Sequence, residues 1–280
     1  MNATWTIASL TVREAVRRRL VAAFAAITVL LVGLTALGFY RLSHGSQMTS
    51  GEVQFAAPQS FVLVMFMFSF VVALSASAIA SAAVSGEIDS GVLQTIITRP
   101  VRRSSVLLGK WLGLVFLLGT YTAVVCGLEV AVVYWATGFL APNPAAAAAF
   151  IFAEGAVLLT LVLLLSTRLS ALAAGVVGVA LFGIAWLAGV AGTLGATFDV
   201  SAIRTASHVA SYLLPTDGLW NGAMFSLEPS SILSQRLGPG STGDPFFAAA
   251  APSWQYLTWA VVWAGLILLA SLLSFERREL

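Results

Sequence analysis

The chain has 280 residues, of which 59% are hydrophobic and 9% are charged, and its formal net charge is +2. A typical soluble domain is about 45–50% apolar and about 25% charged. This composition excludes a soluble globular fold, a disordered chain and a nucleic-acid-binding protein, and it predicts an all-α polytopic membrane protein.

Residues 3–19 are predicted to form an amphipathic helix that lies in the inner membrane interface. Its apolar side chains recur at spacings of three and four, which places them on one helix face. They are Trp5, Ala8, Val12, Ala15 and Val16. Arg13 and Arg17 lie on the other sides, where each basic residue near anionic headgroups contributes about 1 kcal/mol. The same basic residues also serve as a topology signal for the first span.

Six stretches are long and apolar enough to cross the hydrocarbon of a bilayer, which takes about 20 residues in a helix. They are residues 20–39, 61–84, 111–135, 147–167, 169–197 and 254–275. Between them we expect a cytoplasmic coupling loop over 85–110 and an extracytoplasmic loop over 199–253. All of these belong to a single transmembrane domain over residues 1–280.

The basic residues are distributed unevenly between the two sides of the predicted membrane. Eleven of the fourteen lie in the N-terminal segment, the coupling loop, the link between the fourth and fifth spans, and the C-terminal segment. The other three are Arg41, Arg204 and Arg236. Because Lys and Arg are enriched in cytoplasmic segments, we expect both termini in the cytoplasm and the chain in the inner or plasma membrane of the cell.

The coupling loop reads SGEIDSGVLQTIITRPVRRSSVLLGK. Two acidic residues open it, apolar residues follow at helical spacing, and Arg99-Pro100 ends the stretch because the residue before a proline disfavours helix. We expect a short amphipathic helix whose apolar face, exposed in the cytosol, indicates a docking surface for a partner. The candidate contact residues are Glu87, Asp89, Gly91, Leu93, Ile96, Ile97, Arg99, Pro100 and Arg103.

Two carboxylates, Glu129 and Glu154, lie within predicted spans, each near the outer end. A charge inside a membrane is costly and marks a candidate functional site. The two acids could line an exit path for a cationic or polar substrate. The alternative, which we favour for acids near an interface, is that they are hydrated locally or hydrogen-bonded to Thr and Ser.

The fifth span is rich in small residues, including the pairs Ala171/Gly175 and Ala174/Gly178. Small residues four apart let two helix backbones approach closely in lipid. Packing within one bundle is the favoured interpretation, and a dimer face is the alternative. After this span, residues 200–214 are predicted to form a helix that Pro215 ends.

The chain contains none of the motifs that would make it an enzyme. Gly109-Lys110 is followed by Trp111, and position 104 is not glycine, so the sequence has no nucleotide-binding P-loop. It has two histidines and one cysteine, without the spacing of a zinc site. We therefore expect no catalytic residue, no metal and no cofactor in this chain.

The coupling loop resembles that of ABC-2-type permease subunits of ABC transporters. The shared pattern is an acidic residue, a glycine and an apolar helix, then Pro and Arg, and finally Gly-Lys at the next span. The matching residues are Glu87, Gly91, Leu93, Ile96, Pro100, Arg103, Gly109 and Lys110. The start of the chain is similar to the family's elbow helix, and Pro215-Thr216-Asp217 in the long outer loop also fits. There is some likeness to the permease of nitrous-oxide-reductase maturation systems.

This resemblance implies a permease subunit that forms the translocation pathway together with a second copy or a related chain. Separate ABC ATPase subunits would bind ATP and Mg²⁺, residues 87–98 would dock in a cleft of one of them, and the direction would be export. The alternative is an ion-coupled carrier, or a membrane assembly or maturation factor without its own ATPase. A proton-coupled carrier would place ionisable residues near the membrane midplane, where the sequence predicts none.

Overall fold

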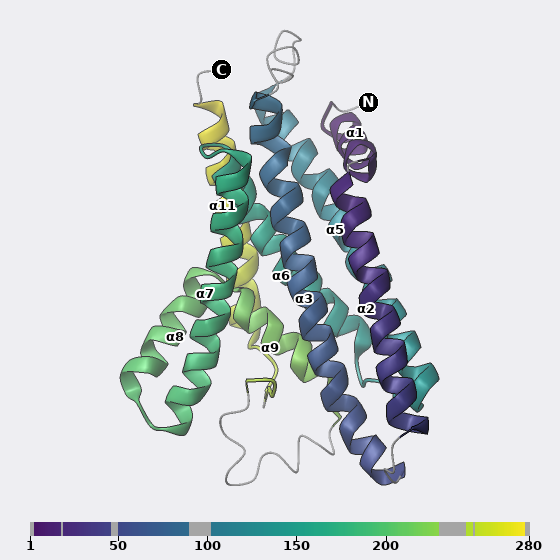
Figure 1. Cartoon of the computed structure of the whole chain (residues 1–280). Helices are drawn as coiled ribbons and strands as arrows, with labels where there is room; N and C mark the ends of the chain where they lie inside the picture. The colour runs from purple at the N-terminus through teal and green to yellow at the C-terminus, as the bar shows by residue number, and fades with distance from the viewer. Residues whose placement is uncertain are drawn as a thin grey trace.

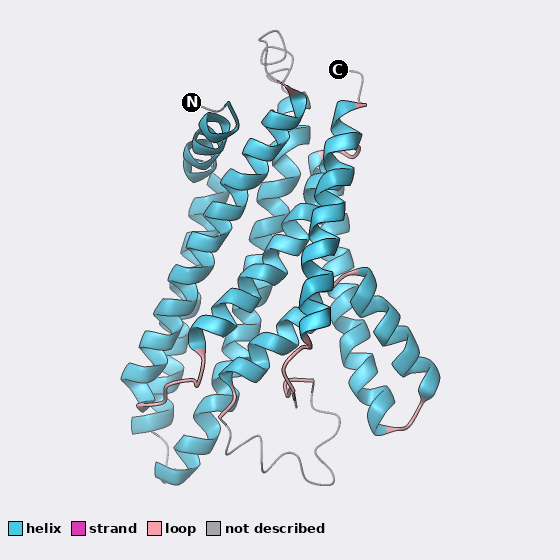
Figure 2. Cartoon of the chain, turned by 180° about the vertical axis from the view of Figure 1, so that it is seen from behind, coloured by secondary structure: helices cyan, strands magenta, loops and turns pink. Residues whose placement is uncertain are grey.

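The computed structural model of the chain describes residues 3–17, 19–45, 50–89, 102–229, 245–248 and 250–277. Within these residues every regular element is an α-helix. Long helices run side by side along one axis (Figures 1 and 2). The predicted all-α class is confirmed.

Six helices are long and apolar enough to cross a membrane, and each overlaps one predicted span. They are α2 (Arg19–His44), α3 (Ser50–Asp89), α5 (Arg103–Thr137), α6 (Pro144–Ser166), α7 (Ala171–Thr197) and α11 (Trp254–Glu276). The six spans are thus confirmed as helices, although several extend beyond the predicted limits.

The helix α3 is the longest element, with 40 residues. At 1.5 Å per residue it measures about 60 Å, twice the thickness of the bilayer hydrocarbon of about 30 Å. The predicted span 61–84 is its apolar middle. The first five residues of the coupling loop belong to α3, and its last eight belong to α5, because backbone hydrogen bonding continues past the apolar stretch in both helices.

Both ends of the described chain lie at the same end of the bundle (Figure 1). The C-terminal end of α3 and the N-terminal end of α5 lie there too. A short helix, α1 (Ala3–Arg17), packs against α5 at this end. Figure 2 shows the same grouping from behind.

At the other end, α7 and α8 (Ser201–Leu213) form a hairpin that stands out to one side of the bundle (Figures 1 and 2). The helix predicted over 200–214 is confirmed, and it ends before Pro215. The next helix, α9 (Thr216–Leu227), packs against α6. The turn between α7 and α8 contains Asp199 with φ of 53°, a left-handed conformation that Asp adopts more readily than most residues.

The small residues of α7 pack within the same chain. The Oγ of Ser77 in α3 donates a hydrogen bond to the Gly175 carbonyl at 2.9 Å. A Cβ added at Gly178 would collide with Val162 of α6 and lie 3.0 Å from the Ser77 Oγ. Both glycines therefore let α7 approach α3 and α6, which agrees with the favoured interpretation of packing within one bundle.

Candidate functional site

The carboxylate of Glu154 lies in the interior of the bundle. Its side chain is 3% exposed, and Oε2 accepts a hydrogen bond from Ser69 Oγ of α3 at 2.8 Å. The neighbouring Gly155 allows this approach, because a Cβ there would lie 2.9 Å from Val72 Cγ1 of α3. A hydrogen bond to Ser or Thr is one of the two environments that the favoured interpretation of these acids expected, and Ser69 supplies it for Glu154.

The second acid, Glu129 of α5, is also fully buried, with 0% exposure. Within the described part of the chain neither of its carboxylate oxygens has a hydrogen-bond partner. The Thr35 side chain of α2 lies near enough to stabilise the carboxylate weakly, but the two groups are not in hydrogen-bonding geometry. Thr35 also lines a largely apolar cavity of ≈ 390 Å³ between α2 and α3. Burying a carboxylate without a hydrogen-bond partner lowers the stability of the fold. Residues that are kept at such a cost are often functional.

The two carboxylates have different neighbours, Ser69 of α3 for Glu154 and Thr35 of α2 for Glu129. The sequence singled out both acids but missed Ser69, because a lone serine in an apolar run carries no sign of a partner 85 residues away.

Replacing Glu129 by leucine is expected to stabilise the fold by about 1–3 kcal/mol, the cost of leaving a buried polar group unpaired. Thermal unfolding of the purified protein in detergent measures the change. Glu154→Leu is the matched control, and it should bring no such gain because Ser69 already hydrogen-bonds its carboxylate. Equal shifts in the two variants, or a loss of stability in Glu129→Leu, would contradict the assignment.

Lys110 connects the two helices that flank the coupling loop. It lies in α5, it is only 5% exposed, and its Nζ donates a hydrogen bond to the Ala83 carbonyl near the end of α3. A buried ammonium group is stable only where it is hydrogen-bonded. Lys110, which the sequence supplied only as part of a resemblance, therefore joins α3 and α5 at this end.

The structure places three of the candidate contact residues of the coupling loop. Glu87 and Asp89 belong to the last turn of α3, and Arg103 is the first residue of α5. Arg103 Nη1 donates a hydrogen bond to the Glu276 carbonyl of α11 at 3.3 Å. The others lie outside the described residues: Gly91, Leu93, Ile96, Ile97, Arg99 and Pro100.

The predicted interfacial helix corresponds to α1, but its apolar residues do not act as one face. Ala8 and Ala15 are buried, whereas Trp5 is 69% and Val16 56% exposed. Ala8 lies over α5, so the helix has a protein-facing side and a free side. Val12 is half-buried, and Arg13 and Arg17 are exposed.

Two glycines of α5 determine how closely α1 approaches. A Cβ added at Gly109 would lie 2.7 Å from the carbonyl oxygen of Thr4, and one at Gly113 would lie 2.7 Å from that of Ala8. Such distances are shorter than van der Waals contact, so only glycine fits at both positions. Because the two glycines are four residues apart on one helix face, they form a shallow seat for the backbone of α1.

Metal-binding chemistry finds no support in the described residues, where no group of three or more His, Cys, Asp or Glu side chains is placed to hold an ion.

Comparison with known proteins adds evidence of a different kind. The family model described as "ABC-2 family transporter protein" matches residues 5–280. A curated relative, "Probable ABC transporter permease protein NosY" of Stutzerimonas stutzeri, is 29% identical over 152 residues, which are 49% of this chain and 52% of the relative. The chain thus spans about half the length of that relative.

Proposed function

Because the chain belongs to the ABC-2 family of transporter proteins, we propose that it is the permease subunit of an ABC transporter, forming the translocation pathway and driven by a separate ATPase. The ATPase subunits bind ATP and Mg²⁺. The permease pairs with a second copy or a related chain in the inner or plasma membrane, and the direction is export. The curated relative, whose printed name is that of a probable ABC transporter permease, supports this role.

The observation that carries the proposal is the grouping of elements at one end of the bundle. The end of α3, the start of α5, α1 and both termini lie there (Figure 1). Basic residues of these elements gather at this end: Arg13, Arg17, Arg102, Arg103, Lys110 and Arg277. By the enrichment of Lys and Arg on the cytoplasmic side, this end faces the cytoplasm, where ATP is available.

The contacts at this end suggest how an ATPase could act on the spans. Residues 87–98 dock on the ATPase, with Glu87 and Asp89 pairing with basic groups there. The flanking helices are joined by the Lys110–Ala83 hydrogen bond, and α5 is joined to α11 by the Arg103–Glu276 hydrogen bond. A displacement of the docked residues is thereby shared among three spanning helices.

The two buried acids are candidates for the lining of the translocation pathway. Glu129 and Glu154 are the intramembrane carboxylates that the sequence singles out, and both lie inside the bundle. We assign them to the lining of a route for a cationic or polar substrate that opens when the helices move. Their burial in the present arrangement fits a closed state of that route.

The proposal is tested by affinity purification of the tagged chain in mild detergent from its native host. We expect a stoichiometric partner of about 25–35 kDa that contains a P-loop. The double variant Glu87→Arg/Leu93→Asp should lose this partner, because it reverses one charge and places another on the apolar docking face.

The matched control carries similar changes at the opposite end of α3, as Glu52→Arg/Phe55→Asp, and it should retain the ATPase. Recovery of the chain without an ATPase under several extraction conditions would overturn the proposal. That result would favour an ion-coupled carrier or an assembly factor.

A further inference from the structure

Residues of α7, α8, α9 and α11 line a polar cavity. The α7–α8 hairpin and α9, which contribute to it, lie in the half of the molecule away from the termini (Figure 1). Its volume is ≈ 460 Å³, enough for a small organic molecule. The polar side chains that line it from three helices include Ser207, His208, Ser211, Asp217, Asn221 and Tyr256. Neither the coupling loop nor the buried acids Glu129 and Glu154 line this cavity.

The helix α8 turns its polar face towards this cavity. Arg204, Ser207, His208 and Ser211 recur at spacings of three and four, so they share one face, and all line the cavity. The opposite side carries Val209 and Leu213, which are 54% and 70% exposed. On a soluble protein, the polar face of a surface helix is exposed and the apolar face is buried; in α8 the arrangement is the opposite. It fits a helix in contact with lipid that encloses a polar compartment.

Asp217 supplies the negative charge of the cavity. Its carboxylate accepts a hydrogen bond from Asn221 Nδ2 at 3.2 Å and lies close against the backbone of α7 at Gly189, where a Cβ would collide with it. Among the described residues it forms no ion pair. Asp217 is thus half-buried and held in place, and its charge is not balanced by a neighbouring cation.

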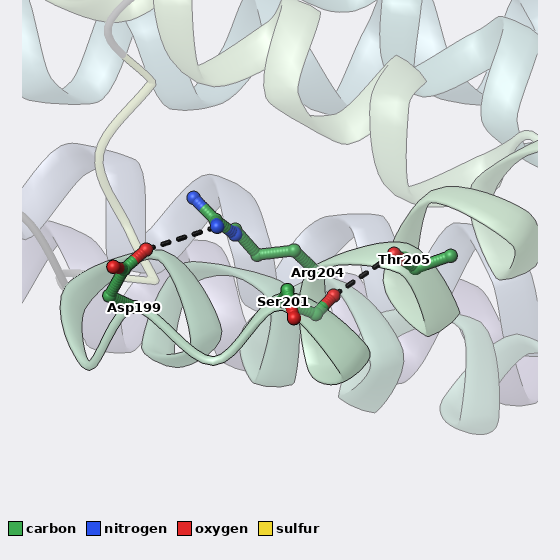
Figure 3. Close-up of polar contacts among 4 residues, drawn as sticks. All are labelled: Asp199, Ser201, Arg204 and Thr205. Atoms are coloured by element: carbon green, nitrogen blue, oxygen red, sulfur yellow. Dashed lines mark hydrogen bonds and ion pairs between the residues drawn. The ribbon is translucent and has the colours of Figure 1, made fainter.

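The arginine that lines the cavity does not fill that role. Arg204 lies on the cavity wall, but its Nη2 is 3.0 Å from Asp199 Oδ1 in the turn between α7 and α8 (Figure 3). The cavity therefore contains an acid without a cation, next to a basic residue that already has its own acid. A cationic ligand in the cavity would balance the negative charge of Asp217.

Two tyrosine rings give the cavity aromatic walls. Tyr212 and Tyr256 have ring centroids 5.9 Å apart at an interplanar angle of 67°. The Tyr256 hydroxyl donates a hydrogen bond to the Ser211 carbonyl at 3.2 Å, and Trp259 Nε1 donates one to the Tyr212 carbonyl at 3.0 Å. A carboxylate together with aromatic faces is the combination that recognises ammonium groups, because the π-face is negative.

We propose that this cavity binds a small organic ammonium cation, with Asp217 as its counter-ion and Tyr212 and Tyr256 as its aromatic walls. The ammonium group belongs either to a free solute or to the headgroup of a lipid, since α8 presents its apolar side outwards. A bare metal ion would need several oxygen ligands at fixed distances, and Asp217 is the one carboxylate among the described residues that line the cavity.

The test uses the purified full chain in nanodiscs of phosphatidylglycerol, titrated with tetramethylammonium chloride by calorimetry. Saturable binding at one site is expected. Asp217→Asn should weaken it at least tenfold and Tyr256→Leu about fivefold, whereas Tyr256→Phe keeps the ring and should bind nearly as wild type does. Glu276→Gln, which removes a carboxylate at the opposite end, is the control and should not change the affinity.

The dependence on pH gives a second readout. Burial raises the pKa of Asp217 to about 7, so the anion that holds the cation is lost as the pH falls through this value. The other ionisable groups around it are Arg204 and His208 of α8, Tyr256 of α11 and Glu154 of α6. We expect the affinity to fall about tenfold between pH 8 and pH 6, and this fall should be smaller in Asp217→Asn.

Repeating the titration in phosphatidylcholine nanodiscs distinguishes the two sources of the ammonium group. Competition by this lipid, seen as a weaker apparent affinity, identifies a headgroup as the occupant, and an unchanged affinity identifies a free solute. Absence of saturable binding in phosphatidylglycerol, or equal affinity in wild type, Asp217→Asn and Tyr256→Leu, would overturn the proposal. None of these measurements requires the ATPase, so the outcome is independent of the proposed transport function.

Discussion

Replacing Gly113 by leucine is expected to displace α1 from α5 and to destabilise the protein by about 3 kcal/mol or more. A Cβ at this position would lie 2.7 Å from the carbonyl oxygen of Ala8 and 3.1 Å from Thr11 Cβ. The first of these is a backbone atom, so no change of rotamer relieves the collision. The whole of α1 must therefore shift to admit the larger side chain.

Thermal unfolding in detergent and limited trypsin digestion measure this effect. In the variant, trypsin should cleave faster after Arg13 and Arg17, since a detached helix is a better substrate than a packed one. Gly127→Leu is the matched control on the same helix, because nothing lies within 4 Å of a Cβ added there. Similar melting temperatures and cleavage rates in the two variants would show that α1 is not seated on these glycines.

The second large effect is expected from Lys110→Met, which keeps an unbranched side chain but removes the ammonium group. A hydrogen bond to a charged group is worth about 1.5–3 kcal/mol, and its loss frees the end of α3 from α5. The proposed ATPase partner should still co-purify, because the residues proposed to dock on it, 87–98, are unchanged. Its permease-dependent ATP hydrolysis should fall at least fivefold, because movement of the docked residues no longer reaches both helices together.

Measuring ATP hydrolysis by the purified complex, with and without the substitution, tests this expectation. Arg102→Gln is the control, since it removes a basic residue that is exposed at the same end of the bundle. If Lys110→Met hydrolyses ATP at the wild-type rate with an unchanged melting temperature, the hydrogen bond to Ala83 has no part in coupling.

The sequence predicted the six spans because each contains an apolar run of the length that a bilayer requires. Their ends were less predictable. The helix α3 begins at Ser50, eleven residues before the predicted span, because polar residues at a membrane surface continue a helix as readily as they form a loop. The end of α8 was predicted correctly, since Pro215 gives a local signal that needs no tertiary contact.

The sequence identified candidate residues of the site, but it did not predict which side chains and helices they contact. The sequence identified Glu154 as an intramembrane acid, whereas its hydrogen bond to Ser69 depends on how α3 and α6 pack. The apolar face predicted for residues 3–19 grouped Trp5 with Ala8. In the structure Ala8 faces α5 and Trp5 does not, because the seat at Gly109 and Gly113 admits only a close backbone with small side chains.

The length of α3 has a mechanical consequence. It is one continuous helix of 40 residues, with Pro58 near its N-terminal end, so the part from Gln59 to Asp89 has no proline at which to bend. This part works as a rigid lever: a tilt of about 5° at the end that carries Glu87 would move the other end, at Gln59, through about 4 Å, given a length of about 46 Å. A rotation of α3 at one end of the bundle thereby becomes a displacement of its other end. A stiffer helix backbone transmits more of this displacement.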